Sequence, residues 1–279
     1  MFPAFLLSLR EGLEAALIVG IVLGVLKRMN RPDLKSSVWI GTASAIVVSL
    51  VAGGILTIIG ISLEGRSEQI FEGFTMLLAA GILTWMIFWM NRQGQYLREG
   101  MEKGVRKAVN TRSSRRALFG LAFLAIVREG IELALFLTAT TFVDYQGRIV
   151  LGALVGLSAA ILLGWLLFSA TVRLDLRRFF QVTGVLLFLF AAGLVAHGVH
   201  EFNEAGWIPS IVAHVWDINP LVDENSIAGI ILKTLFGYNG NPSLSEVIAY
   251  LAYYMLVFVG LKRITGAATK VMPDVSQPS

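Results

Sequence analysis

The chain has 279 residues, of which 56% are hydrophobic and only 15% are charged, with a formal net charge of +4. A soluble domain carries roughly a quarter charged residues, whereas the apolar residues here form repeated runs long enough to cross a bilayer. Soluble protein classes are therefore excluded. The absence of cysteine also excludes disulfides, thiolate metal sites, iron–sulfur clusters and cysteine nucleophiles.

Seven apolar segments predict membrane-spanning helices, since about 20 apolar residues are needed to cross a hydrocarbon core of about 30 Å. The first segment is expected to stay in the mature protein, because it lacks the basic start and the cleavage site of a signal peptide. Before the seventh, Ser243 and Glu246 have the spacing of a helix capping box. The predicted spans cover residues 2–27, 37–61, 69–91, 117–141, 148–172, 179–200 and 245–263.

The basic residues between the spans predict the orientation. With the N-terminus outside, 18 Lys and Arg residues fall in cytoplasmic segments and 3 fall in outer segments. This asymmetry follows the positive-inside rule, so we expect a multi-pass protein of the inner membrane with a cytoplasmic C-terminus. It also explains the net positive charge without a nucleic-acid partner. The basic segment 92–116 additionally offers a contact for anionic membrane lipid.

A five-residue motif occurs twice. Residues 10–14 of the first span read Arg-Glu-Gly-Leu-Glu, and residues 128–132 of the fourth span read Arg-Glu-Gly-Ile-Glu. Weaker similarities between the second and fifth spans and between the third and sixth spans indicate two three-helix repeats followed by one C-terminal helix. A unit with an odd number of crossings is inverted when it repeats, and inverted repeats place a transporter's substrate site near the midplane.

The sequence therefore predicts an all-α polytopic membrane protein with seven transmembrane helices. Its expected units are the first repeat (1–91), a basic cytoplasmic loop (92–116), the second repeat (117–200), an acidic outer loop (201–244), and the seventh helix with a cytoplasmic tail (245–279).

Each motif places two carboxylates on one face of a helix, because residues three apart are neighbours on a helical surface. Both motifs lie roughly 15 Å into their spans, where a charged side chain costs ~2.5–3.5 kcal/mol to insert. In each copy the arginine and the last glutamate are at i, i+4 and can pair. That pairing leaves Glu11 and Glu129, with a formal charge of −2. Two interpretations stay open: a structural ion-pair network, or a site where carboxylates bind a hard cation.

The paired motifs on the first and fourth of seven spans resemble those of the oxidase-dependent iron permeases, most closely the bacterial EfeU-type branch. The similarity extends over nearly the whole chain, through residues 71–73, 82–90, 191–194, 204–206 and 236–246. It implies a transporter with iron as its substrate, no permanently bound cofactor, and separate periplasmic or extracellular proteins that bind or oxidise iron. The metal-handling residues that it implies are Glu11, Glu14, Glu129 and Glu132, and we expect Arg10 and Arg128 to support them.

A second group of acids and histidines is predicted at the outer ends of the third and sixth spans, where negative charge would concentrate cations. For Glu72 and Glu201, iron relay and solvated surface charge both stay open. For the two histidines, hydrogen bonding across helices competes with metal ligation. The candidates for an outer relay are Glu68, Glu72, His197, His200, Glu201 and Glu204.

We therefore expect an iron permease that imports iron through a midplane site of four glutamates. One alternative is a proton-coupled transporter of another divalent metal such as manganese. The other is a membrane enzyme with a carboxylate metal centre. Ferritin-like enzyme sites use Glu-x-x-His motifs, whereas the motifs here contain no histidine.

Overall fold

The computed structural model describes residues 1–93, 96–169, 176–210, 212, 214–223, 226, 229, 232–233 and 236–269, and within these residues the secondary structure is helical without strands. The helices are α1 (Phe2–Arg28), η1 (Pro32–Leu34), α2 (Lys35–Ser62), α3 (Arg66–Gln93), α4 (Tyr96–Val109), α5 (Ser114–Thr141), α6 (Gln146–Ser169), α7 (Leu176–Glu204) and α9 (Leu244–Thr269).

Each of the seven predicted spans coincides with one of the long helices, which extend a few residues past most predicted ends. Residues with left-handed backbone conformation follow several of the helices. Asn30 has a φ of 54° after α1, Gly65 a φ of 60° between α2 and α3, and Gly206 a φ of 69° after α7. Glycine adopts this conformation without a steric penalty. Residues 170–172 of the predicted fifth span and 270–279 of the predicted tail lie outside the described residues.

Five of these helices are long and apolar enough to cross a membrane, namely α2, α3, α6, α7 and α9. Helices α1 and α5 are 27 and 28 residues long. Each carries the three charges of its motif in its central part. Those charges reduce the hydropathy of α1 and α5, although both are as long as a membrane crossing requires.

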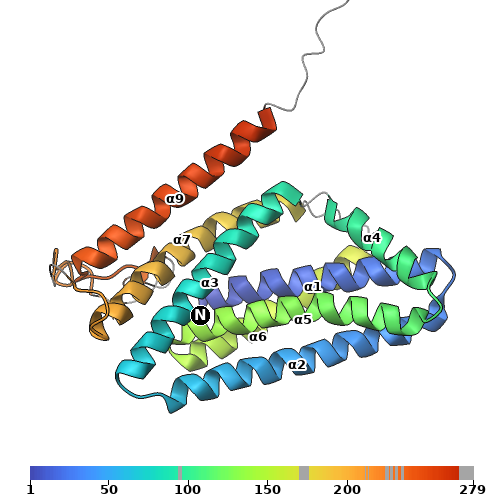
Figure 1. Ribbon diagram of the computed structural model, residues 1–279, viewed down its shortest axis with the longest axis horizontal. Coiled ribbons are helices and arrows are strands. Elements are labelled where there is room, and N and C mark those ends of the chain that lie inside the picture. Colours follow the sequence, from blue (N-terminus) through green and yellow to red (C-terminus); the bar gives the residue numbers. More distant parts are fainter. Residues whose placement is uncertain are drawn as a thin grey trace, which may run out of the picture.

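The long helices pack in pairs. Helix α1 lies along α6, α2 along α5 and α3 along α7, while α9 packs on α7 (Figure 1). The helices of the first two pairs approach each other closely because glycine residues of one helix face the backbone of the other. A Cβ added to Gly156 of α6 would lie 2.5 Å from the carbonyl oxygen of Phe5, and one added to Gly41 of α2 would lie 2.6 Å from that of Phe119. Small residues of this kind allow membrane helices to approach closely.

The segment 92–116, expected to be a loop, contains helix α4. Its apolar residues Val105, Ala108 and Val109 are buried in one cluster with residues of α1 and α5. They recur at the three- and four-residue spacing of a helix face. The loop prediction missed this helix because it weighed the basic residues of the segment and not the apolar spacing between them.

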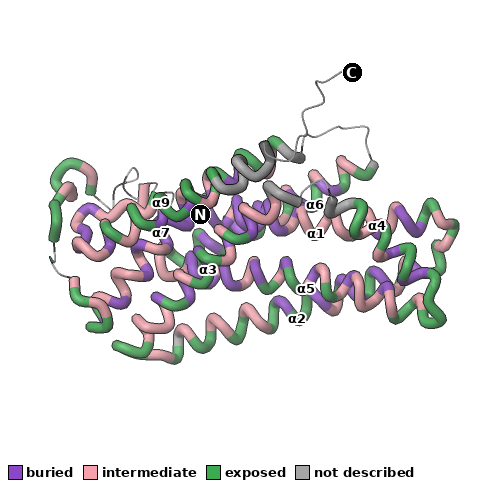
Figure 2. Tube along the Cα trace, turned by 45° about the horizontal axis from the view of Figure 1, so that its top comes forward, coloured by how far each residue is buried: buried purple, intermediate pink, exposed green. Residues whose placement is uncertain are grey.

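Apolar side chains also cover the outside of the molecule. Figure 2 shows exposed residues recurring along the whole of α2, where Leu50 is 71% exposed and Ile58 is 68% exposed. Helices α6 and α9 carry further exposed apolar residues, among them Ile161 and Leu256. An apolar surface of this extent is typical of contact with lipid.

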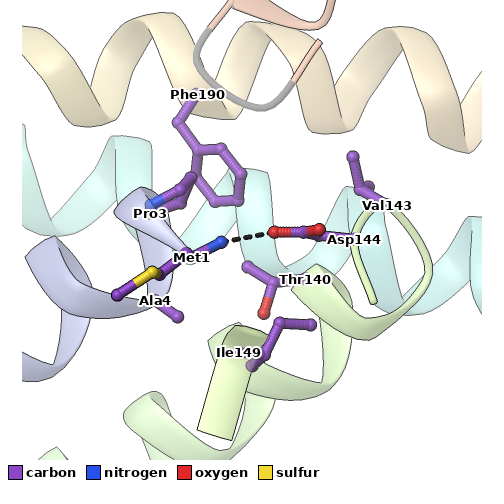
Figure 3. A pocket seen from close by; sticks show the side chains of 8 residues that line it. All are labelled: Met1, Pro3, Ala4, Thr140, Val143, Asp144, Ile149 and Phe190. Atoms are coloured by element: carbon purple, nitrogen blue, oxygen red, sulfur yellow. Dashed lines mark hydrogen bonds and ion pairs between the residues drawn. The ribbon is translucent and has the colours of Figure 1, made fainter. Parts of the chain in front are cut away.

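The start of α3 and the end of α7 together carry Glu68, Glu72, Glu201 and Glu204, and we call this end of the molecule the acidic end. The amino group of Met1 contacts the carboxylate of Asp144 there, in a small pocket beside Thr140, Ile149 and Phe190 (Figure 3). This contact brings the start of α1 to the turn between α5 and α6. The Gln69 side chain donates a 2.9 Å hydrogen bond to Glu204, which joins the start of α3 to the end of α7.

Among the described residues, α1 contributes to three buried apolar clusters, and two of these include residues toward its opposite ends. The cluster toward the acidic end includes Leu7 of α1, Met76 of α3 and Phe136 of α5, each 0% exposed. The other includes Val22 of α1 and Leu118 of α5, also 0% exposed. The motif residues 10–14 lie between them in the sequence of α1.

Candidate metal site

The two motifs lie in the central parts of α1 and α5, and their glycines are points of close helix contact. A Cβ added to Gly12 would lie 2.8 Å from the Cβ of Ala160 on α6. A Cβ added to Gly130 would lie 2.1 Å from the Oγ of Ser49 on α2. The glycine of each motif therefore faces a neighbouring helix, while the glutamates of the two motifs turn toward each other.

Three of the four predicted glutamates come together. Glu11, Glu14 and Glu129 each offer a carboxylate oxygen, and these oxygens lie within 4.8 Å of one another. Glu11 is 1% exposed and Glu129 is 6% exposed. Within the described residues, one buried oxygen on each of the three carboxylates has no hydrogen-bond partner. Buried anionic oxygens without hydrogen bonds are costly to maintain, and a cation is the partner that suits them, above all those of Glu11 and Glu129, since Oε1 of Glu14 lies 3.3 Å from Arg10.

Arg10 is the buried cation next to these carboxylates. Its Nη1 lies 3.4 Å from Oε1 of Glu11, and its Nη2 lies 3.3 Å from Oε1 of Glu14. The same two nitrogens also donate to the sulfur atoms of Met86 and Met90 on α3, at 3.3 and 3.4 Å. The guanidinium is therefore shared between α1 and α3.

Arg128 occupies a different environment. Its Nε donates a 2.8 Å hydrogen bond to Oε1 of Glu132, and its side chain is 41% exposed. The guanidinium carbon lies 5.8 Å from the ring centre of Trp85 and 5.4 Å from that of Trp89. These distances fit cation–π contacts. Glu132 is thus turned toward Arg128, and among the described residues it is not part of the three-carboxylate group.

The predicted pairing at i, i+4 is present in both motifs, but one inference drawn from it is wrong. Glu11 was expected to lack an arginine partner, whereas Arg10 contacts both Glu11 and Glu14. The terminal nitrogens of one buried guanidinium can reach two carboxylates, which counting pairs along a helix does not reveal. For Glu129, no ion pair is present within the described part of the chain.

The residues predicted for the outer relay lie at the acidic end, and three of the six have other contacts. His197 donates through Nδ1 to the carbonyl oxygen of Gly193, 3.0 Å away on its own helix. His200 lies 3.0 Å from Glu246 of α9 and 3.2 Å from Glu204. Only His200 makes the contact across helices that the competing interpretation expected, through Glu246 of α9, whereas His197 bonds within α7.

Glu68, Glu72 and Glu201 share this end of α3 and α7. Glu72 lies within electrostatic reach of Glu68, Glu201 and Glu204. The predicted capping box is confirmed: Glu246 accepts from the backbone nitrogen and the hydroxyl of Ser243, and the Ser243 hydroxyl accepts from the backbone nitrogen of Glu246.

Several residues next to the motifs were not among the predicted site residues. Met86 and Met90 contact Arg10, and the stacked rings of Trp85 and Trp89, 6.5 Å apart, contact Arg128. The hydroxyl of Ser8, one turn before Glu11, is buried without a described partner. The two methionines and the two tryptophans each have i, i+4 spacing on α3. This spacing indicates that the members of a pair share one face of α3, but it does not identify the helix that this face contacts.

Comparison with known proteins gives the family. The sequence profile of the iron permease FTR1 family matches residues 1–271. The ferrous iron permease EfeU of Yersinia pestis is 34% identical over 273 residues, covering 96% of this chain and 97% of the relative. The putative inactive ferrous iron permease EfeU of Escherichia coli K12 and the ferrous iron permease EfeU of Escherichia coli O157:H7 are each 35% identical over 260 residues, covering 93% of this chain and 94% of each relative. No solved structure matches. The relatives are permeases and not enzymes, and this multi-pass membrane protein belongs to the iron permease FTR1 family.

Proposed function

We propose that this protein imports ferrous iron across the cytoplasmic membrane through a site formed by Glu11, Glu14 and Glu129, with Glu132 held beside it by Arg128. Three carboxylate oxygens within 4.8 Å of one another carry the proposal, two from the buried Glu11 and Glu129 and one from the partly buried Glu14. Ionised carboxylates supply the oxygen ligands that hard and borderline divalent cations accept. The family and the names of the relatives supply the choice of iron.

Charge balance supports a divalent ion at this position. The three clustered glutamates carry three negative charges when ionised, and the buried Arg10 offsets one of them. Arg128 and Glu132 neutralise each other. The remaining formal charge of −2 equals that counted from the two motifs, and a divalent cation cancels it. Without a cation, these carboxylates would bear the cost of buried charge.

The two apolar clusters supply the barriers that a transporter needs. Leu7, Met76 and Phe136 close the side toward the acidic end, and Val22 and Leu118 close the opposite side. An ion bound between two such clusters would leave in either direction only after the helices move. We propose that the clusters open in turn, which is the alternating access expected of inverted-repeat transporters.

Helix pairing supports the proposed repeat. If α1, α2 and α3 correspond to α5, α6 and α7, then the α1–α6 pair corresponds to the α5–α2 pair. These two pairs make the most extensive helix contacts of the molecule, and the motif glycine contacts the partner helix in each. The iron site would then lie between equivalent helices, as the inverted arrangement predicts.

For orientation, we propose that the acidic end faces outward. The positive-inside rule supports this direction, because the basic residues concentrate in the segments at the other end. Glu68, Glu72, Glu201 and Glu204 would attract cations to the outer mouth by their field. His200 and Glu246 would serve mainly to hold α9 against α7, since their polar atoms already contact each other.

The test is iron uptake by proteoliposomes that contain a trapped iron chelator. We expect Glu11→Gln combined with Glu129→Gln to abolish uptake of ferrous iron, because the site loses two of its three clustered carboxylates. A matched control, Glu99→Gln combined with Glu102→Gln, removes the same charge from α4 and is expected to leave uptake intact. Retained uptake in the motif variant would contradict the proposed site.

Metal competition tests the identity of the cargo. Ferrous iron is expected to enter the vesicles, and an excess of magnesium is expected to leave its uptake unchanged. Entry of manganese without iron in either oxidation state would replace the iron proposal with a transporter of another divalent metal.

A further inference from the structure

The guanidinium of Arg10 has an unusual set of acceptors for a buried cation. Its side chain is 1% exposed, and each terminal nitrogen approaches one carboxylate and one thioether. The thioethers belong to Met86 and Met90, which are four residues apart on α3 and therefore share a face of that helix. Helix α1 supplies the carboxylates, so Arg10 bridges two helices.

The contact lengths show which acceptors hold the guanidinium. A charge-assisted bond between a guanidinium and a carboxylate is usually about 2.7–2.9 Å long. Arg10 lies 3.4 Å from Glu11 and 3.3 Å from Glu14, well beyond that range. Its contacts to the two sulfurs are 3.3 and 3.4 Å. Sulfur is a larger atom than oxygen, so these are close contacts, and the guanidinium is drawn toward α3.

We propose that Met86 and Met90 are positioning residues that hold Arg10 away from close pairing with Glu11 and Glu14. The inference rests on the proposed iron site. A thioether is a weak, uncharged acceptor, so it can hold the guanidinium without adding charge to the site. The carboxylates then keep oxygens available to a cation: Oε2 of Glu11 and Oε2 of Glu129 lack a hydrogen-bond partner within the described residues, and Oε1 of Glu14 meets Arg10 only at 3.3 Å, without a hydrogen bond.

Without the sulfurs, Arg10 would move onto the two carboxylates and form short bonds. An arriving iron ion would then have to displace the guanidinium, and its apparent affinity would fall. This consequence separates the proposal from the ordinary role of methionine as an adaptable filler of apolar space. A filler can be replaced by leucine with little effect on affinity, because the volumes of the two side chains are similar.

The experiment compares three variants in proteoliposomes by the concentration dependence of ferrous iron uptake. Met86→Leu with Met90→Leu removes both acceptors and is expected to raise the apparent KM on the order of tenfold, while the maximal rate per folded protein stays near that of the wild type. Met86→Gln with Met90→Gln restores an acceptor at each position and is expected to return the KM toward the wild-type value. Met255→Leu is the control, since Met255 is an exposed methionine of α9 that belongs neither to the barrier clusters nor to the surroundings of Arg10.

An unchanged KM in the double leucine variant would overturn the proposal, as would glutamine variants with a KM as high as the leucine variants. If the double variant does not accumulate, Met86→Leu and Met90→Leu are measured singly, and each is expected to raise the KM by a smaller factor than the pair. Failure of the proposed function is distinguishable, because it would appear as wild-type vesicles without iron uptake or as uptake that survives the loss of Glu11 and Glu129.

Discussion

The two copies of the Arg-Glu-Gly-x-Glu motif have nearly the same sequence but different surroundings. In α1, Arg10 is 1% exposed and makes long contacts to two glutamates and two methionines. In α5, Arg128 is 41% exposed, makes one short bond to Glu132 and lies against two tryptophans. The first copy therefore contributes both of its carboxylates to the candidate site, whereas the second contributes one and keeps the other paired.

Helix α3 accounts for this difference. Trp85 and Trp89 form one face of the helix, and Met86 and Met90 form the adjacent face, one residue further along. Successive residues are about 100° apart around a helix, so residues 85–90 of α3 present aromatic rings to Arg128 and thioethers to Arg10. Two nearly identical motifs thus acquire different properties from the neighbouring helix. The following predictions test how far that difference extends.

The largest effect is expected from removing the two arginines in turn. Arg10→Leu leaves the three clustered glutamates without their buried counter-charge, and breaking a buried ion pair costs about 3–5 kcal/mol. Arg128→Leu removes a partner that is 41% exposed and bonds a single glutamate outside the three-carboxylate group, so we expect a smaller loss. Thermal unfolding in detergent, followed by circular dichroism, measures both. Equal losses would show that the difference in burial has no energetic consequence.

A smaller effect is expected from adding one methyl group to each motif glycine. Gly130→Ala places its Cβ 2.1 Å from the hydroxyl oxygen and 2.6 Å from the Cβ of Ser49, whereas Gly12→Ala places it 2.8 Å from the Cβ of Ala160. Overpacking of this kind costs about 1–3 kcal/mol, and we expect Gly130→Ala to be the more destabilising change.

Second-site substitutions provide the control for these two variants. Ser49→Gly should restore stability only to Gly130→Ala, and Ala160→Gly only to Gly12→Ala, because each removes the atoms that the new methyl group meets. Rescue of both variants by either substitution would mean that the contacts are not specific, and the unfolding midpoints decide between these outcomes.

Much of the fold could be predicted from the sequence because a bilayer imposes a simple requirement. About 20 apolar residues must form a helix, and the seven predicted spans coincide with long helices. The capping box was also predictable, since Ser243 and Glu246 interact within one turn. Helix α4 was missed because its apolar residues are few and are separated by charges.

The site was predictable only in part. Motif spacing indicates which carboxylates share a face of one helix, but it does not give the rotation of α3 against α1 and α5. The thioethers beside Arg10 and the rings beside Arg128 depend on that rotation. The same limit explains the wrong expectation that Glu11 has no arginine partner, because tertiary packing determines how one guanidinium is shared.

The smallest effect is expected at the aromatic contact of Arg128. A cation–π contact contributes about 0.5–1 kcal/mol at an exposed position, and Trp89 is nearer to Arg128 than Trp85 is, at 5.4 against 5.8 Å. In a double-mutant cycle of Trp89→Leu with Arg128→Leu, the loss of stability in the double variant should be smaller than the sum of the two single losses by about that amount. The same cycle with Trp39→Leu, an exposed tryptophan of α2, should be additive.

Pairing Trp89→Leu with Arg10→Leu sharpens the comparison further. Arg10 donates to thioethers on the adjacent face of α3 and not to the indole rings, so this cycle should also be additive. Coupling of Trp89 to Arg128 but not to Arg10 would show that α3 contacts the two motifs through separate faces. Coupling of equal size to both arginines would contradict it, because the two faces of α3 would then act as one surface and the asymmetry between the motifs would not originate in this helix.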